Sequence, residues 1–231
     1  MSKARRRRAV LASGILAVAG MLIAASSAWA ALVLKADWQM NETSGQEMID
    51  SSANNNNGTP MGGVVQTGSL YVFNGSTSYV VVPDNDSLDP LEKNIKLRAS
   101  VRVTDAPMDD DSYDIVRKGL SATPGGDYKM EIKGTSDPTV GKLHCVFKGT
   151  GGTVRNLAQP DIVDGNRHTL GCIKRRDSVV AKVDGRSYTK TGSAGSISNP
   201  TNVLVGAKTA APLLDDVFDG KMDFVSIDIA Q

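Results

Sequence analysis

The sequence is poor in the residues that most often carry catalysis. Its 231 residues include only two histidines and two cysteines, and it contains no G-x-S-x-G motif. Neither His144 nor His168 has the C-x-x-C or H-x3-H neighbours that a zinc site needs, and both lie inside expected strands, where structural histidines are common. These shortages argue against zinc chemistry and against a serine or cysteine nucleophile.

Glutamates are also scarce, and their spacing does not match a glucanase. β-Glucanases with a sandwich fold place an acid and a nucleophile on one strand, as E-x-D-x-x-E or E-x-D-x-E. Glu42 and Glu47 have the outer spacing of the first pattern, but Ser44 stands where the aspartate belongs. We therefore predict no catalytic residues and a protein that is not an enzyme. A hydrolase built on an aspartate pair is the least favoured alternative.

Aromatic residues make up 5% of the chain, which leaves few rings for stacking on sugars. Most of them fall within apolar runs that are expected to be strands. Tyr113 and Tyr128 flank expected loops and are the best candidates for stacking on a ligand, but core packing is the favoured interpretation for either one.

The first thirty residues have the pattern of a secretory signal peptide. Lys3 and Arg5–Arg8 form a basic segment, an apolar run follows, and Ala28-Trp29-Ala30 is an A-x-A cleavage pattern. We expect cleavage before Ala31 and a secreted, extracellular product of bacterial export. An uncleaved membrane anchor is the alternative, and the arginine pairs also resemble a twin-arginine signal, although general secretion is favoured.

Removal of this leader changes the net charge. The full chain has 26 basic and 25 acidic side chains, and five of the basic ones lie in the leader, so 21 remain against 25, a net charge of −4. A mildly acidic exported chain lacks the basic footprint of a nucleic-acid-binding protein. We also expect no membrane insertion of the mature chain.

Residues 31–231 are expected to form one all-β domain. Short apolar runs, many with period-two alternation, are separated by turn sequences such as NGS, GTGG and VDGN, and no long helical pattern occurs. This spacing is typical of an antiparallel two-sheet sandwich or jelly roll. Cys145 and Cys172 lie on the inward faces of two such runs, and two cysteines in an exported chain indicate a disulfide, with two buried free thiols as the alternative.

The segment Asp50–Pro60, DSSANNNNGTP, is interpreted as a tight loop between strands. Asparagines tolerate left-handed backbone geometry and bond their own chain, and Gly58 is expected to take the most strained position.

Taken in order, these segments resemble the laminin-G-like jelly-roll domains of the concanavalin A-like lectin/glucanase superfamily. The segments that show this resemblance are ADWQMNETSGQEMIDSSANNNNGTP, LYVFNGSTSYVVVPDNDSLDP, DIVRKG with DYKMEI, DGNRHTLGCIKRRDSVVAKVDG, and NVLVGAK with FDGKMDFVSIDI. The paired cysteines look like those of small secreted actinobacterial members. Arg167 and Val101 depart from the pattern, since many members have tryptophan there, and sugar stacking is correspondingly weaker.

The resemblance implies a two-sheet antiparallel jelly roll that recognises a ligand at one rim, in some relatives with calcium. Carried over by position, the calcium ligands would be Asp127, Asp215 and Asp216. We therefore predict a secreted, non-catalytic module that binds a glycan between loops 119–127 and 208–219, with Tyr113, Tyr128 and Asp219 near the ligand. The alternative is a protein–protein or cell-envelope adhesion module, because one fold serves both functions.

Overall fold

The computed structural model describes residues 31–231, so the expected leader and its cleavage site lie outside the described residues. The regular secondary structure of this part of the chain is all strand apart from one 3-10 turn, η1 (Asp86–Leu88). The strands are β1 (Leu32–Trp38), β2 (Thr59–Met61), β3 (Val65–Gln66), β4 (Tyr71–Asn74), β5 (Tyr79–Val82), β6 (Ile95–Arg102), β7 (Ser112–Lys118), β8 (Asp127–Gly134), β9 (Gly141–Gly149), β10 (Gly152–Asp161), β11 (Arg167–Lys174), β12 (Ser178–Val183), β13 (Arg186–Thr191), β14 (Val203–Val205) and β15 (Asp219–Ala230).

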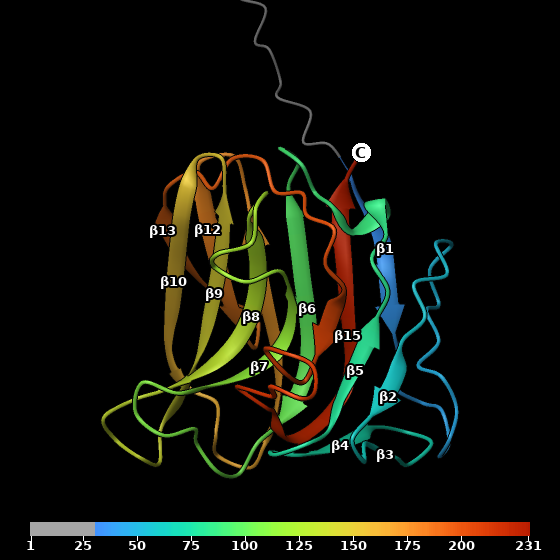
Figure 1. The fold of residues 1–231 in the computed structure, drawn as a ribbon. Coiled ribbons are helices and arrows are strands. Elements are labelled where there is room, and N and C mark those ends of the chain that lie inside the picture. The colour runs from blue at the N-terminus through green and yellow to red at the C-terminus, as the bar shows by residue number, and fades with distance from the viewer. Residues whose placement is uncertain (1–30) are drawn as a thin grey trace, which may run out of the picture.

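The strands form two antiparallel sheets that pack face to face (Figure 1). One sheet has eight strands in the order β13-β12-β11-β6-β15-β4-β3, with β1 also paired to the long β15. The other has seven, in the order β10-β9-β8-β7-β14-β5-β2. Strands far apart in sequence are neighbours, as where β14 lies between β7 and β5. The predicted all-β jelly-roll sandwich is confirmed.

Period-two alternation explains how the core is filled. In β9 the inward side chains Leu143, Cys145 and Phe147 are fully buried, and in β11 Leu170 and Cys172 are buried in the same way. Because successive side chains of a strand point to opposite faces, one face of each sheet supplies the apolar layer and the other remains polar. One contiguous cluster of buried side chains fills the space between the sheets.

The predicted disulfide joins the two sheets through this core. Cys145 lies on β9 of the seven-stranded sheet and Cys172 on β11 of the eight-stranded sheet, with their Cα atoms 5.4 Å apart. Both cysteines are fully buried. The bond therefore fixes the distance between the sheets at one point, and the alternative of two free thiols is wrong.

The asparagine-rich loop is held by one buried carboxylate. Asp50 accepts hydrogen bonds from the backbone N–H groups of Ser52 and Asn56, each at 2.8 Å. The expectation for Gly58 is corrected, because the left-handed residue is Asn55, at φ 56°. Gly58 is required for space instead, since a Cβ there would lie 2.7 Å from side-chain carbons of Met48 and Val80.

The beginning of the described chain and its end lie side by side (Figure 1). The backbone N–H of Gln231 donates to the carbonyl of Ala31 at 3.2 Å. Among residues 31–231, no helix is long and apolar enough to cross a membrane.

Candidate functional site

A cavity of about 370 Å³ opens on the outer, polar face of the seven-stranded sheet. Strands β7 to β10 form its floor, and parts of two loops form its walls. Its lining combines five basic side chains with one carboxylate, one imidazole and small or aliphatic residues: Arg117, Leu120, Ser121, Ala122, Asp127, Lys129, His144, Val146, Lys148, Thr153, Arg155 and Lys208.

Strand register brings these side chains onto one face. Residues directly opposite each other in an antiparallel pair point to the same side of the sheet. Arg117 lies opposite Lys129, Lys129 opposite Val146, and Val146 opposite Arg155, so a single row crosses four strands. The next row toward one end of the sheet joins Asp127 to Lys148. The outward positions of β7–β10 therefore form a continuous polar surface.

Two loops enclose this surface from one side. Lys148 donates from Nζ to the carbonyl of Ser121, which ties the 119–126 loop to β9. The loop that follows β14 supplies Lys208 to the same cavity. A second cavity of about 250 Å³ shares Arg117, Leu120 and Lys208 with the first. The two loops that the sequence predicted to meet, 119–127 and 208–219, thus border adjoining cavities.

Asp127 is the one acidic residue in the cavity lining, and it is almost fully buried. Burial raises its pKa above the ordinary value of an aspartate, and four nearby cations partly offset this rise. Those cations are Arg117, Lys129, Lys148 and Arg155. Asp127 is therefore a buried negative charge in a positive environment, with one carboxylate oxygen lacking a hydrogen-bond partner.

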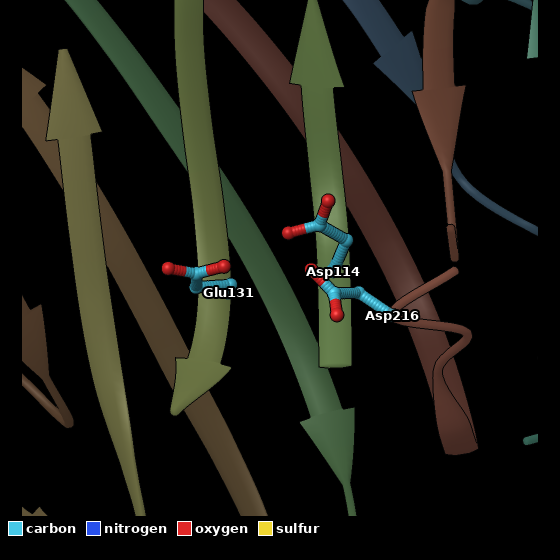
Figure 2. Close-up of side chains that lie close together, drawn as sticks. All are labelled: Asp114, Glu131 and Asp216. Atoms are coloured by element: carbon cyan, nitrogen blue, oxygen red, sulfur yellow. The ribbon is translucent and has the colours of Figure 1, made fainter. Parts of the chain in front are cut away.

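Beside the cavity, three carboxylates converge (Figure 2). Asp114 from β7, Glu131 from β8 and Asp216 from the loop before β15 each offer an oxygen within 4.8 Å of the others. Asp114 and Glu131 are direct cross-strand partners, which explains their proximity. Burial raises the pKa of Asp114 and of Asp216.

Each of these carboxylates already has a cationic partner. Arg117 Nε lies 2.5 Å from Asp114 Oδ2, and Lys208 Nζ lies 3.3 Å from Asp216 Oδ2. Glu131 contacts Lys129 and accepts a hydrogen bond from His144 Nδ1 at 2.7 Å. Burial acts to raise the pKa of Glu131, but these two partners outweigh it and lower that pKa below its ordinary value.

The converging group fits internal ion pairing better than calcium binding. Calcium takes six to eight oxygen ligands, whereas here three cations and one histidine already contact the three carboxylates. The predicted ligands Asp127, Asp215 and Asp216 do not converge either, since within residues 31–231 only Asp216 belongs to the converging group. Asp215 instead accepts from Lys208 Nζ at 2.5 Å, and Asp127 lines the cavity.

The predicted ligand-contacting residues lie in three different environments. Tyr128 is fully buried and donates its hydroxyl to the carbonyl of Leu88 at 3.1 Å, so the expectation that it stacks on a ligand is corrected. Tyr113 is half-buried, and its ring packs edge-on against Phe218 with centroids 6.2 Å apart. Asp219 is half-buried at the start of β15, opposite Asn74 of β4. None of the three lines the cavity described above.

The basic side chains of the cavity were not predicted from the sequence. Lys129, Lys148 and Arg155 lie at outward positions of three strands with period-two alternation, and that alternation was the available signal in the sequence. Alternation shows that a side chain faces outward, but only the strand order shows that these three face one another. His144, expected to be purely structural, also lines the cavity. His168 does not line the cavity; its ring nitrogens form hydrogen bonds with the carboxylates of Asp184 and Asp164.

No protein-family model matches the sequence, and neither does any curated protein. Solved structures do share the fold. The binding domain of botulinum neurotoxin DC, in complex with SialylT, aligns with a TM-score of 0.59 and 11% identity over 85% of this chain and 46% of that chain. Domain 4 of AbnA, a GH43 extracellular arabinanase from Geobacillus stearothermophilus, was solved in complex with arabinotriose. It aligns with a TM-score of 0.58 and 14% identity, over 86% of this chain and 93% of that chain.

Domains LG4-5 of the mouse laminin alpha1 chain align with a TM-score of 0.54 and 14% identity, over 73% of this chain and 44% of that chain. The chain spans about half the length of the neurotoxin and laminin structures. At these identities the comparison concerns the fold alone. By that fold, the chain is a jelly-roll β-sandwich.

Proposed function

We propose that this chain is an exported, non-catalytic domain that binds a glycan in the cavity on the outer face of β7–β10. The observation that carries the proposal is the composition of that cavity. It is a preformed hollow in which several hydrogen-bonding side chains converge, which is the usual construction of a ligand site. Rigid strands hold most of them, so little ordering is needed on binding.

The lining suits hydroxyl-rich ligands. Arg117, Lys129, Lys148 and Arg155 offer N–H donors, and Asp127 and Thr153 offer acceptors. Aliphatic atoms of Leu120 and Val146 lie between these polar groups and can cover the apolar face of a sugar ring. Binding of this kind needs no bridging metal, and we propose that it is independent of calcium.

The ligands named for structures of similar fold support the proposal. The arabinanase domain was solved with arabinotriose, and the neurotoxin binding domain with SialylT. A third structure concerns cell entry of botulinum neurotoxin type C through two ganglioside molecules. These ligands belong to those proteins. They favour a glycan over other ligand classes as the ligand that we propose for this chain.

A glycan array tests the proposal directly. The exported protein is expected to bind a restricted set of glycans, equally with calcium or with chelator. An Arg155→Ala variant should lose most of this binding, because Arg155 is exposed and its removal should leave the fold intact. Failure to bind any glycan would overturn the proposal and favour the adhesion-module alternative. Release of reducing sugar from a bound polysaccharide would overturn the non-catalytic part.

A further inference from the structure

We infer that the cavity selects an acidic sugar, whose carboxylate or sulfate group is held by Lys148 and Arg155 beside Arg117. This inference rests on the proposed glycan-binding function and names the chemical class of the ligand.

The charge of the cavity has the opposite sign to that of the domain around it. Residues 31–231 carry a net charge of −4. The cavity lining nevertheless contains five basic side chains and a single carboxylate. A hollow lined mainly by one sign of charge focuses the field and concentrates ligands of the other sign.

Two of these cations form no ion pair with a carboxylate of the described residues. Arg117, Lys129 and Lys208 each contact a carboxylate that lies outside the cavity lining. Lys148 and Arg155, by contrast, have no carboxylate within 4 Å among the described residues. Lys148 donates to a backbone carbonyl, and Arg155 is exposed to solvent. These two side chains are therefore the ones that can give their charge to a ligand.

Strand register places the two cations together. Lys148 lies opposite Thr153, and Arg155 follows Thr153 by two residues on β10. Lys148 and Arg155 are thus diagonal neighbours on one face, about 7–8 Å apart at their backbones, which long side chains span. An arginine can hold a carboxylate or sulfate through two parallel hydrogen bonds, and a lysine adds a point charge.

The lining residues also favour an acidic ligand over a neutral one. No tyrosine, tryptophan or phenylalanine lines the cavity, so ring stacking contributes nothing to affinity there. Hydrogen bonds to charged groups are about twice as strong as those between neutral groups. Lys148 and Arg155 can donate to any sugar hydroxyl, but only a ligand with an acidic group also gains the attraction between opposite charges.

Asp127 offers a second test, in which a substitution is expected to strengthen acidic binding rather than weaken it. Its buried carboxylate lies among four cations and opposes the entry of another negative charge. Removing that charge in Asp127→Asn should strengthen the binding of an acidic glycan. The same substitution should weaken or leave unchanged the binding of a neutral sugar that uses Asp127 as an acceptor.

The experiment is an array that prints sialylated, uronate-bearing and sulfated oligosaccharides, each beside the same backbone without its acidic group. The wild-type protein should prefer the acidic member of a pair, and this preference should shrink as salt screens the charges. Sialylated and uronate pairs report carboxylate recognition, and sulfated pairs report sulfate recognition. Either one supports the inference.

Variants locate the effect. Lys148→Ala and Arg155→Ala should each weaken acidic binding by about tenfold or more, the loss expected for one charge-assisted hydrogen bond. Arg102→Ala and Lys221→Ala are matched controls, since both are exposed cations on the outer side of the other sheet. They should leave binding unchanged. Circular dichroism and thermal melts confirm that each variant is folded.

Each outcome has a separate meaning. A preference for neutral glycans overturns this inference and leaves the proposed function standing. Acidic binding that survives Lys148→Ala and Arg155→Ala, or that falls in the control variants, also overturns it. Absence of binding to every glycan overturns both. Tighter acidic binding by Asp127→Asn supports the inference, and weaker acidic binding by that variant contradicts it.

Discussion

Replacing Cys145 and Cys172 together by alanine removes the disulfide cross-link between the two sheets. The cross-link closes a loop between residues 27 positions apart. In the chain-entropy relation, a loop of that length stabilises the native state by roughly 3.5 kcal/mol at 25 °C. Loss of two buried sulfur atoms from the core adds on the order of 1 kcal/mol each, by analogy with a buried methylene group.

The cross-link contribution alone corresponds to a lower melting temperature of roughly 7–14 °C for a domain of this size. Differential scanning calorimetry of the oxidised protein and of the double alanine variant measures the total loss. Reduced wild-type protein, which keeps both sulfur atoms, separates the cross-link from the packing contribution. A melting temperature within about 2 °C of wild type in the folded variant would refute this reasoning, since even 1 kcal/mol shifts it by that much.

Four further predictions concern the loop, a histidine, the leader and calcium. Asp50→Ala should lower the free energy of unfolding in urea by about 3 kcal/mol, because buried N–H groups lose a charged acceptor; a loss under about 1 kcal/mol would contradict this. Burial acts to lower the pKa of His168, but the carboxylates of Asp184 and Asp164 outweigh burial and raise this pKa above its ordinary value. The protonated histidine therefore stabilises the folded state at acid pH, and this stabilisation is lost as the pH rises through the raised pKa. His168→Gln should therefore destabilise more at acid than at alkaline pH, and the reverse order in pH-dependent melts would contradict this. Mass spectrometry of the exported protein should give Ala31 as the first residue, whereas a retained leader would contradict cleavage. Millimolar calcium should not raise the melting temperature relative to chelator, since the converging carboxylates already contact protein cations; a clear rise would contradict this.

Local patterns in the sequence were sufficient to predict the sandwich. Alternation in β9 and β11 correctly placed Cys145 and Cys172 inside, because successive side chains of a strand point to opposite faces. The sequence was less informative about backbone detail. Gly58 was expected to be left-handed, but Asn55 takes that conformation, and Gly58 is needed because the side chains of Met48 and Val80 fill the space that a Cβ would take.

The site was harder to predict because it depends on strand order. Arg117, Lys129 and Arg155 meet only because β7, β8, β9 and β10 are consecutive neighbours in register. Asp216 reaches Asp114 from a loop much later in the chain, and no local spacing signals that contact. Tyr128 looked accessible because it lies next to a glycine-rich loop, but its position on β8 turns its ring into the core.

The most direct test of the binding site is a backbone amide NMR titration with the strongest acidic glycan from the array. Binding at the cavity predicts shifts concentrated on β7–β10 around Arg117, Lys148 and Arg155, together with the 119–126 loop. The same titration of Arg155→Ala should show these shifts only at higher glycan concentration. Shifts confined to the eight-stranded sheet or to the asparagine-rich loop would contradict the assignment of the site.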